Sequence, residues 1–195
     1  MKGLTTIICL FLLAVSSAVS EQADAIELTR DNPRTLISTK SIDYTIHGLR
    51  LGITHSQAWD ILAKTNSLMG LKDVFNPSRI YVYGRMPDGS KGEAVLYLIW
   101  EAGEKTMSQI TVFQRFRDSL SKNFRRLLTF EAVDDQSPFK REFIGYANRS
   151  KTTLDVPTIG LKHITYFYDE IGLEVTHKRS SDGDEVVFAL VQPKR

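Results

Sequence analysis

The residues that could act as nucleophiles, acids or metal ligands do not fall into the spacings that such chemistry requires. The chain has no Gly-x-Ser-x-Gly elbow, and no Ser-x-x-Lys with a partnering Lys-Thr-Gly. Asp182-Gly183-Asp184 lacks the further acids of a calcium loop and is typical of a hairpin turn. The four histidines form no His-x-x-x-His pair and have no glutamate at metal-ligand spacing: His47, His55, His163 and His177. The sequence predicts no catalytic residue, metal site or cofactor. A hydrolase with dispersed catalytic residues stays open, because triad members can lie far apart in sequence.

The segment from 115 to 126 is strongly basic. Around it, apolar side chains recur at spacings of three or four residues, the stripe of an amphipathic helix. One interpretation is a basic face for anionic lipid, lipopolysaccharide or glycan, where each charge is worth about 1 kcal/mol. The other, which we favour, is a connector helix within 117–136 whose stripe is core and whose cations are solvated. The five basic residues are Arg115, Arg117, Lys122, Arg125 and Arg126.

Aromatic residues on strand-like runs are the second candidate for binding. Tyrosine and arginine are enriched among the anchors of protein interfaces. We therefore expect a non-enzymatic module that binds another envelope or extracellular protein through exposed sheet and loop aromatics. With 25 Lys and Arg against 23 Asp and Glu, global charge does not favour nucleic acid as a partner. The candidate anchors are Tyr81, Tyr83, Tyr97, Tyr166 and Tyr168.

The N-terminal residues have the three-part layout of a secretory signal. Lys2 supplies a charge, Leu4–Val15 is free of charge, and small residues precede Glu21. Residues 1–20 are therefore predicted to be a cleavable signal peptide, followed by a polar leader over 21–41. Cys9 lies in the middle of the apolar run rather than at its end, so we expect no lipid anchor. A mature chain without cysteine favours a periplasmic or secreted protein, bacterial rather than eukaryotic.

The chain reads as the same series of elements twice. Thr54-His55-Ser56-Gln57 has the form of a capping box and predicts a helix start, and Ser137-Pro138 predicts another. Landmarks such as these recur at a spacing of about 80 residues. We expect an α+β fold of two similar units, 42–116 and 137–195, joined by 117–136. Each unit would be a short helical segment packed on a three-stranded antiparallel meander. The predicted strands are 79–86, 94–101 and 108–116, then 162–168, 173–179 and 185–191.

The run Gly48-Leu49-Arg50-Leu51-Gly52-Ile53-Thr54, followed by a helix through Trp59 and Leu62, resembles a known helix entry. It is similar to that of the outer-membrane assembly lipoprotein (BamE/SmpA-like) type of envelope domain. The resemblance implies a helix pair on a three-stranded meander. Tandem copies would resemble the β-lactamase-inhibitor-type architecture, in which two sheets form a concave protein-binding face. The family's lipobox cysteine is absent here. The resemblance implies binding rather than catalysis.

Overall fold

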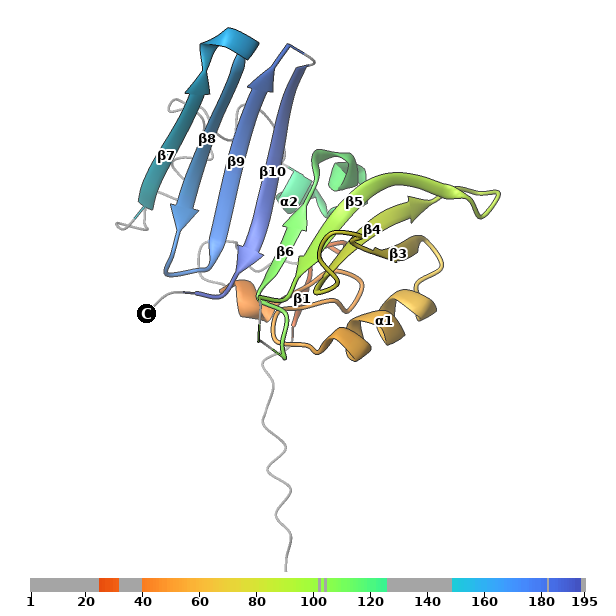
Figure 1. The fold of residues 1–195 in the computed structure, drawn as a ribbon. Helices are drawn as coiled ribbons and strands as arrows, with labels where there is room; N and C mark the ends of the chain where they lie inside the picture. The colour runs from red at the N-terminus through yellow and green to blue at the C-terminus, as the bar shows by residue number, and fades with distance from the viewer. Residues whose placement is uncertain are drawn as a thin grey trace, which may run out of the picture.

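An eight-stranded antiparallel sheet forms the body of the protein (Figure 1). The computed structural model describes residues 25–31, 40–101, 103, 105–125, 149–181 and 183–193. The strand order is β3-β4-β5-β6-β10-β9-β8-β7, so two consecutive meanders lie side by side. The strands are β3 (Leu68–Lys72), β4 (Arg79–Arg85), β5 (Lys91–Ile99), β6 (Gln109–Val112), β7 (Arg149–Val156), β8 (Leu161–Tyr168), β9 (Leu173–Ser180) and β10 (Gly183–Val191).

The turns between neighbouring strands form where the sequence supplies glycine. Gly89 takes φ +82° between β4 and β5, and Asp88 Oδ1 accepts hydrogen bonds from the Ser90 amide and hydroxyl. Gly183 takes φ +122° where β9 turns into β10. Glycine has no Cβ, so it adopts these angles without the penalty that other residues meet. All six predicted strands are present.

The prediction of an α+β fold with two separate helix-plus-meander units is wrong. The chain is mostly β, and its two meanders merge into one sheet because β6 and β10 pair with each other. Phe188 lies opposite Val112 and Leu190 opposite Ile110, with all four side chains buried. Pairing the last strand of each meander buries both edges, which removes two rows of unpaired backbone groups. The recurring spacing of landmarks reflects successive hairpins, and the tandem architecture implied by the resemblance is not adopted.

Two strands of the eight-stranded sheet were not predicted, and they are its two edges. β3 (Leu68–Lys72) contains Gly70, and β7 (Arg149–Val156) is mostly polar. Both lack the run of β-branched and aromatic residues that marks a central strand. The helix predicted after Ser137 lies outside the described residues.

One helix, α1 (His55–Lys64), packs against β3. It begins with the predicted capping box: the Gln57 amide donates to Thr54 Oγ1 at 3.3 Å, and the Thr54 amide donates to Gln57 Oε1 at 2.8 Å. A Cβ on Gly70 would stand 2.8 Å from both Leu62 and Trp59. Glycine on β3 therefore lets the helix approach closely. No described helix is long and apolar enough to cross a membrane.

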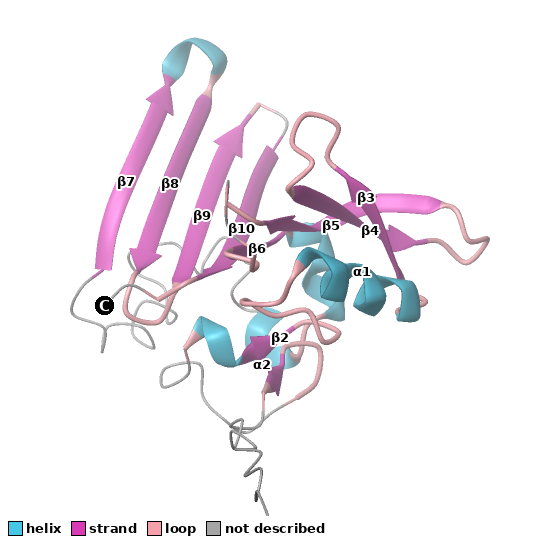
Figure 2. Ribbon diagram, turned by 60° about the horizontal axis from the view of Figure 1, so that its bottom comes forward, coloured by secondary structure: helices cyan, strands magenta, loops and turns pink. Residues whose placement is uncertain are grey.

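The two short strands within residues 26–45 and the helix α2 (Lys122–Arg125) lie on the same side of the sheet as α1 (Figure 2). β1 (Ile26–Glu27) and β2 (Tyr44–Thr45) form a parallel pair. The Glu27 carboxylate fastens this pair, because it accepts hydrogen bonds from backbone or hydroxyl groups of Thr29, Thr45, His47 and Gly48. One buried apolar cluster joins these elements to both meanders. Its other members come from η3 (Gln114–Ser119) and α2.

A second fastening ties the N-terminal segment to the C-terminal meander. η2 (Ser41–Asp43) begins at Ser41, which is fully buried; its amide donates to the Ile171 carbonyl at 2.7 Å and its hydroxyl to the Val191 carbonyl. Gly172 adjoins this contact and has φ +69°, and its carbonyl accepts a hydrogen bond from the Val191 amide at 2.8 Å. A Cβ at 172 would overlap the Val191 carbonyl and the Ser41 hydroxyl. The backbone is therefore too close for any larger residue.

Gly172→Ala is expected to destabilise the protein by at least about 2 kcal/mol more than Gly89→Ala. Both glycines have positive φ, so both variants lose about 1–2 kcal/mol to backbone strain. Only position 172 adds a collision, since nothing lies within 4 Å of a Cβ at 89. Urea unfolding of the two variants measures the difference. Equal decreases in the free energy of unfolding would contradict the expectation. They would show that the backbone where η2, the β8–β9 turn and β10 meet can move apart without an energetic penalty.

Candidate functional site

Three predicted tyrosines lie together on the outer face of the first meander. Strand residues alternate between the two faces, and Ile80, Val82, Leu96 and Leu98 point into the core. Tyr81, Tyr83 and Tyr97 therefore point to the opposite face, where they are half-buried. We call this surface the tyrosine face and define it by Leu71, Arg79, Tyr81, Tyr83, Lys91 and Tyr97.

The side chains of the tyrosine face contact one another across the strands. The rings of Tyr81 and Tyr97, directly opposite in the β4–β5 ladder, stack with centroids 4.3 Å apart. Tyr83 follows at 6.3 Å from Tyr81. A cation lies over each end of this row: Arg79 Cζ is 5.8 Å from the Tyr97 centroid and Lys91 Nζ is 4.6 Å from that of Tyr83. Cross-strand aromatic pairs and cation–π contacts each hold such side chains in place.

The loop between β3 and β4, residues 73–78, is joined to this row by hydrogen bonds. The Tyr97 hydroxyl donates to Asp73 Oδ2 at 2.7 Å and accepts from Arg79 Nη1 at 3.2 Å. The other oxygen, Asp73 Oδ1, accepts from the amides of Phe75 at 2.9 Å and Asn76 at 3.3 Å. One carboxylate thus links the tyrosine row to the backbone of the loop.

Further contacts fix both ends of the 73–78 loop. The Asp73 amide donates to the Arg79 carbonyl and the Arg79 amide to the Asn76 carbonyl, both at 3.0 Å. The Ser78 carbonyl accepts from the Trp100 amide at 3.1 Å.

His55, at the start of α1, lies near this end of the loop, and its ring centroid is 4.8 Å from that of Trp100. Burial and the nearby charge of Lys72 lower the pKa of His55, against a hydrogen bond to the backbone of Pro77.

At the tip of this loop two large apolar side chains project from the protein. Val74 is 86% exposed and Phe75 is 95% exposed. Neighbouring Leu71, on the tyrosine face, is 40% exposed. Single exposed apolar residues are ordinary, but Val74 and Phe75 are adjacent and lie on a loop that is hydrogen-bonded to the tyrosine face.

The network around Tyr97 has an electrostatic signature. Burial, and then donation to Asp73, raises the pKa of Tyr97 to about 12. The Tyr97 hydroxyl, followed by the loop amides, lowers the pKa of Asp73. The phenol is therefore neutral and the carboxylate charged at neutral pH. Because the pKa of Asp73 is lowered, its contribution to the loop is present at neutral pH and is lost only as pH falls through that lowered value.

Two of the predicted anchors, Tyr166 and Tyr168, are not exposed aromatics. Both point into the core and are 4% exposed. On β8 the alternation places Ile164, Tyr166 and Tyr168 on the inner face and Thr165 and Phe167 on the outer one. The sequence shows the alternation but not which of its two faces is inside, because both carry aromatic residues.

The basic segment is not one amphipathic helix. η3 ends at Ser119, the chain is extended at Leu120 (ψ 153°), and α2 begins at Lys122. Phe116, Leu120 and Phe124 are buried, as the connector interpretation expects. Three of the predicted cations have separate partners. Arg115 pairs with Glu93 at 3.3 Å and Arg117 with Asp118 at 3.6 Å, and Arg125 Nε donates to the Leu120 carbonyl at 2.9 Å. Lys122 is exposed. Arg126 lies outside the described residues. Dispersed, partnered cations favour the connector over an anionic-surface site.

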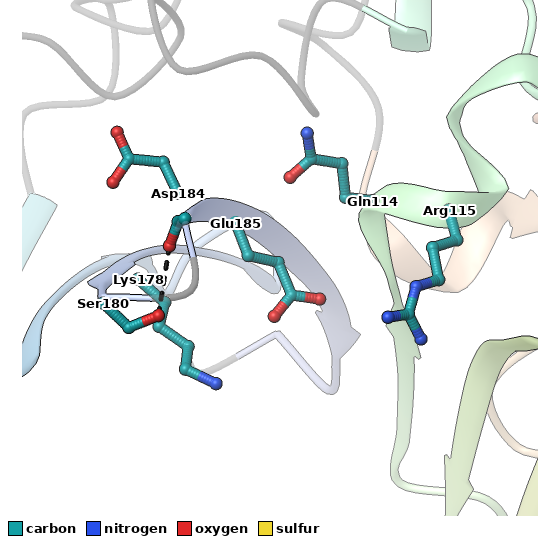
Figure 3. Close-up of a pocket in the computed structure, with 7 residues that line it drawn as sticks. Gln114, Arg115, Lys178, Ser180, Asp184 and Glu185 are labelled. Carbon is teal, nitrogen blue, oxygen red and sulfur yellow. Dashed lines mark hydrogen bonds between the residues drawn. The ribbon is translucent and has the colours of Figure 1, made fainter.

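A hollow of about 410 Å³ separates η3 from the β9–β10 hairpin (Figure 3). Gln114 and Arg115 line one side, with Asp184 and Glu185 across from them. Lys178 and Ser180 complete the labelled lining. Positive and negative side chains both line this hollow, and Arg115 is paired with Glu93. The lining therefore does not favour a ligand of either charge. Among the described residues no group of three or more His, Cys, Asp or Glu side chains could hold a metal ion.

No protein-family model, curated protein or solved structure matches this chain.

Tyr81, Tyr83 and Tyr97 were predicted from the sequence, but the residues that contact them were not. Asp73, Val74, Phe75, Arg79 and Lys91 were not predicted as site residues. One signal was available: Val74 and Phe75 are large apolar residues immediately before the turn pair Asn76-Pro77, where loop residues are usually polar. The link from Asp73 to Tyr97 crosses 24 positions and depends on the β4–β5 register, which the sequence does not give.

Tyr97 is expected to remain protonated up to about pH 11, because its pKa is about 12. Carbon-13 NMR of protein labelled at tyrosine Cζ would follow the titration, with the Tyr97 signal assigned by its absence in Tyr97→Phe. Asp73→Asn should lower the midpoint without restoring an ordinary value, since burial is the larger cause. A Tyr97 signal that titrates near pH 10 in the unchanged protein would contradict the Asp73–Tyr97 network.

Proposed function

We propose that this chain is an exported, non-enzymatic binding module that docks a protein partner on the tyrosine face and the 73–78 loop. The observation that carries the proposal is the 95% exposure of Phe75 on a loop held by Asp73 and Tyr97. An exposed aromatic side chain gives nothing to the stability of the fold. Its burial in a partner's pocket would contribute about 1.5–3 kcal/mol.

The composition of the surface supports a protein as the partner. Tyrosine and arginine, with an apolar anchor, are the residues over-represented among interface hot spots. The stacked rings of Tyr81 and Tyr97 turn their faces to each other and are half-buried, so part of each ring remains exposed to a partner. Such amphipathic groups suit the mixture of apolar and polar contacts at a protein interface.

The fixed geometry of the loop also supports binding. A flexible loop loses conformational freedom when a partner orders it, at about 0.5–1.5 kcal/mol per immobilised side chain. Here the Phe75 and Asn76 amides are already bound to Asp73, and the 73–78 loop is closed by two backbone hydrogen bonds between Asp73, Asn76 and Arg79. The backbone of the loop is therefore ordered before a partner binds, and only its exposed side chains lose conformational freedom on binding.

Export is a part of the proposal that rests on the sequence alone. Residues 1–20, the predicted signal peptide, lie outside the described residues. If the prediction holds, the partner is another envelope or extracellular protein, and the protein recovered from its native compartment begins near Glu21.

Phe75→Ser is expected to weaken binding of the partner by at least about 30-fold, which corresponds to the hot-spot threshold of about 2 kcal/mol. The partner is first captured in native cells by a photo-crosslinking amino acid at position 75, then purified for a dissociation constant. Leu154→Ser is the matched control, since Leu154 is also exposed, at 53%, but lies on the edge strand β7. In urea unfolding, both variants should have the same free energy of unfolding as the unchanged protein, within about 0.5 kcal/mol.

Two outcomes would contradict the proposal. One is that position 154 captures the same partner as position 75 with equal yield. The other is that Phe75→Ser leaves the dissociation constant unchanged while Leu154→Ser raises it.

A further inference from the structure

We infer that the partner presents an extended acidic segment, with apolar side chains between its carboxylates, that lies along β4 on the tyrosine face. The inference rests on the proposed function and names the chemistry of its partner. It is carried by the charge of the surface and by the placement of that charge at the two ends of the tyrosine row.

The cations of the tyrosine face have no carboxylate partner among the described residues. Neither Arg79 nor Lys91 forms an ion pair there, and each is instead held over a tyrosine ring. Arg79 donates one hydrogen bond from Nη1 to Tyr97, and its Nε is buried without a hydrogen-bond partner in the described structure. A buried donor on a charged group is costly to leave unpaired. The buried Nε is out of reach of a partner, but Nη2 makes no hydrogen bond with the described residues and is the donor that an incoming carboxylate would contact.

The acids nearest to these cations in the fold are already engaged. Asp73 accepts from Tyr97 and from two loop amides. Asp88 accepts from Ser90, and Glu93 pairs with Arg115. Asp73 offsets part of the charge of Arg79, while Lys91, at the other end of the row, has no ion-pair partner among the described residues. Charge complementarity favours an acidic partner and disfavours a basic one.

The positions of the cations indicate the length of the segment. Lys91 lies opposite Arg85 in the β4–β5 ladder, at the far end of β4 from Arg79. Positions 79 and 85 are six residues apart, about 20 Å of strand at about 3.3 Å per residue, and this is an upper limit because the two cations lie over the rings of Tyr97 and Tyr83. An extended peptide of about the same length reaches from one cation to the other. Its intervening apolar side chains would contact Tyr81, Tyr83 and exposed Leu71, with Val74 and Phe75 beyond the Arg79 end.

Selection from a displayed library of random twelve-residue peptides on the purified protein tests this inference. The enriched peptides are expected to contain aspartate or glutamate on both sides of apolar residues. Exposed charges are screened over about 8–10 Å in physiological salt, so binding of a synthesised peptide should weaken several-fold between 50 and about 300 mM salt. The double variant Arg79→Gln, Lys91→Gln should weaken it at least about 10-fold. Lys162→Gln, an exposed cation on β8, is the matched control and should not change it.

The remaining variants separate the inference from the proposed function. Arg79→Lys with Lys91→Arg keeps both charges and should recover part of the affinity, losing only the planar fork at position 79. Enriched peptides that are neutral or basic, yet lose binding in Phe75→Ser, would overturn the acidic segment and leave the proposed function standing. The absence of any enriched peptide would overturn an extended linear segment. Salt-sensitive binding to phosphatidylglycerol vesicles that Phe75→Ser abolishes would overturn both, because the surface would then recognise lipid.

Discussion

The pairing of β6 with β10 is the constraint on which the rest of the structure depends. It joins two meanders into a single sheet of eight strands, with Ile110, Val112, Phe188 and Leu190 buried at the junction. Helices α1, η3 and α2 and the β1–β2 pair share the inner side of that sheet with the common core. The outer side of β3–β5 is consequently left to the tyrosine face.

On that outer side, one hydrogen bond between two side chains determines the position of the 73–78 loop. The Tyr97 hydroxyl and the Asp73 carboxylate connect the ladder of stacked rings to the 73–78 loop. The neutral phenol and the charged carboxylate coexist across the neutral pH range, because the pKa of Tyr97 is raised and that of Asp73 is lowered. The sheet thereby sets the position of Phe75 through one short chain of hydrogen bonds. Local rigidity and exposure of an apolar anchor, found together, are what a preorganised binding surface requires.

The sequence predicted the local features of this protein better than their assembly. The capping box at Thr54 and the hairpin turn at Gly183 are confirmed because each depends on neighbours within a few residues. The fold class was wrong because the β6–β10 pairing joins positions more than 70 residues apart, and hydrophobic pattern alone does not say which strand edges meet. Tyr166 and Tyr168 failed as exposed anchors for a related reason: two aromatic faces alternate on β8, and only packing decides which is buried. The partners of Tyr97 could not be found without the strand register.

Hydrogen–deuterium exchange of the protein with and without its captured partner tests the central claim most directly. The backbone amides of the 73–78 loop and of the adjoining strands β3 and β4 should exchange more slowly in the complex, and those of β7 should be unchanged. The amides of Phe75 and Asn76, already bound to Asp73, should also exchange more slowly than a flexible loop in the free protein. Protection confined to β7 or to residues 114–125, with the 73–78 loop unaffected, would contradict the account.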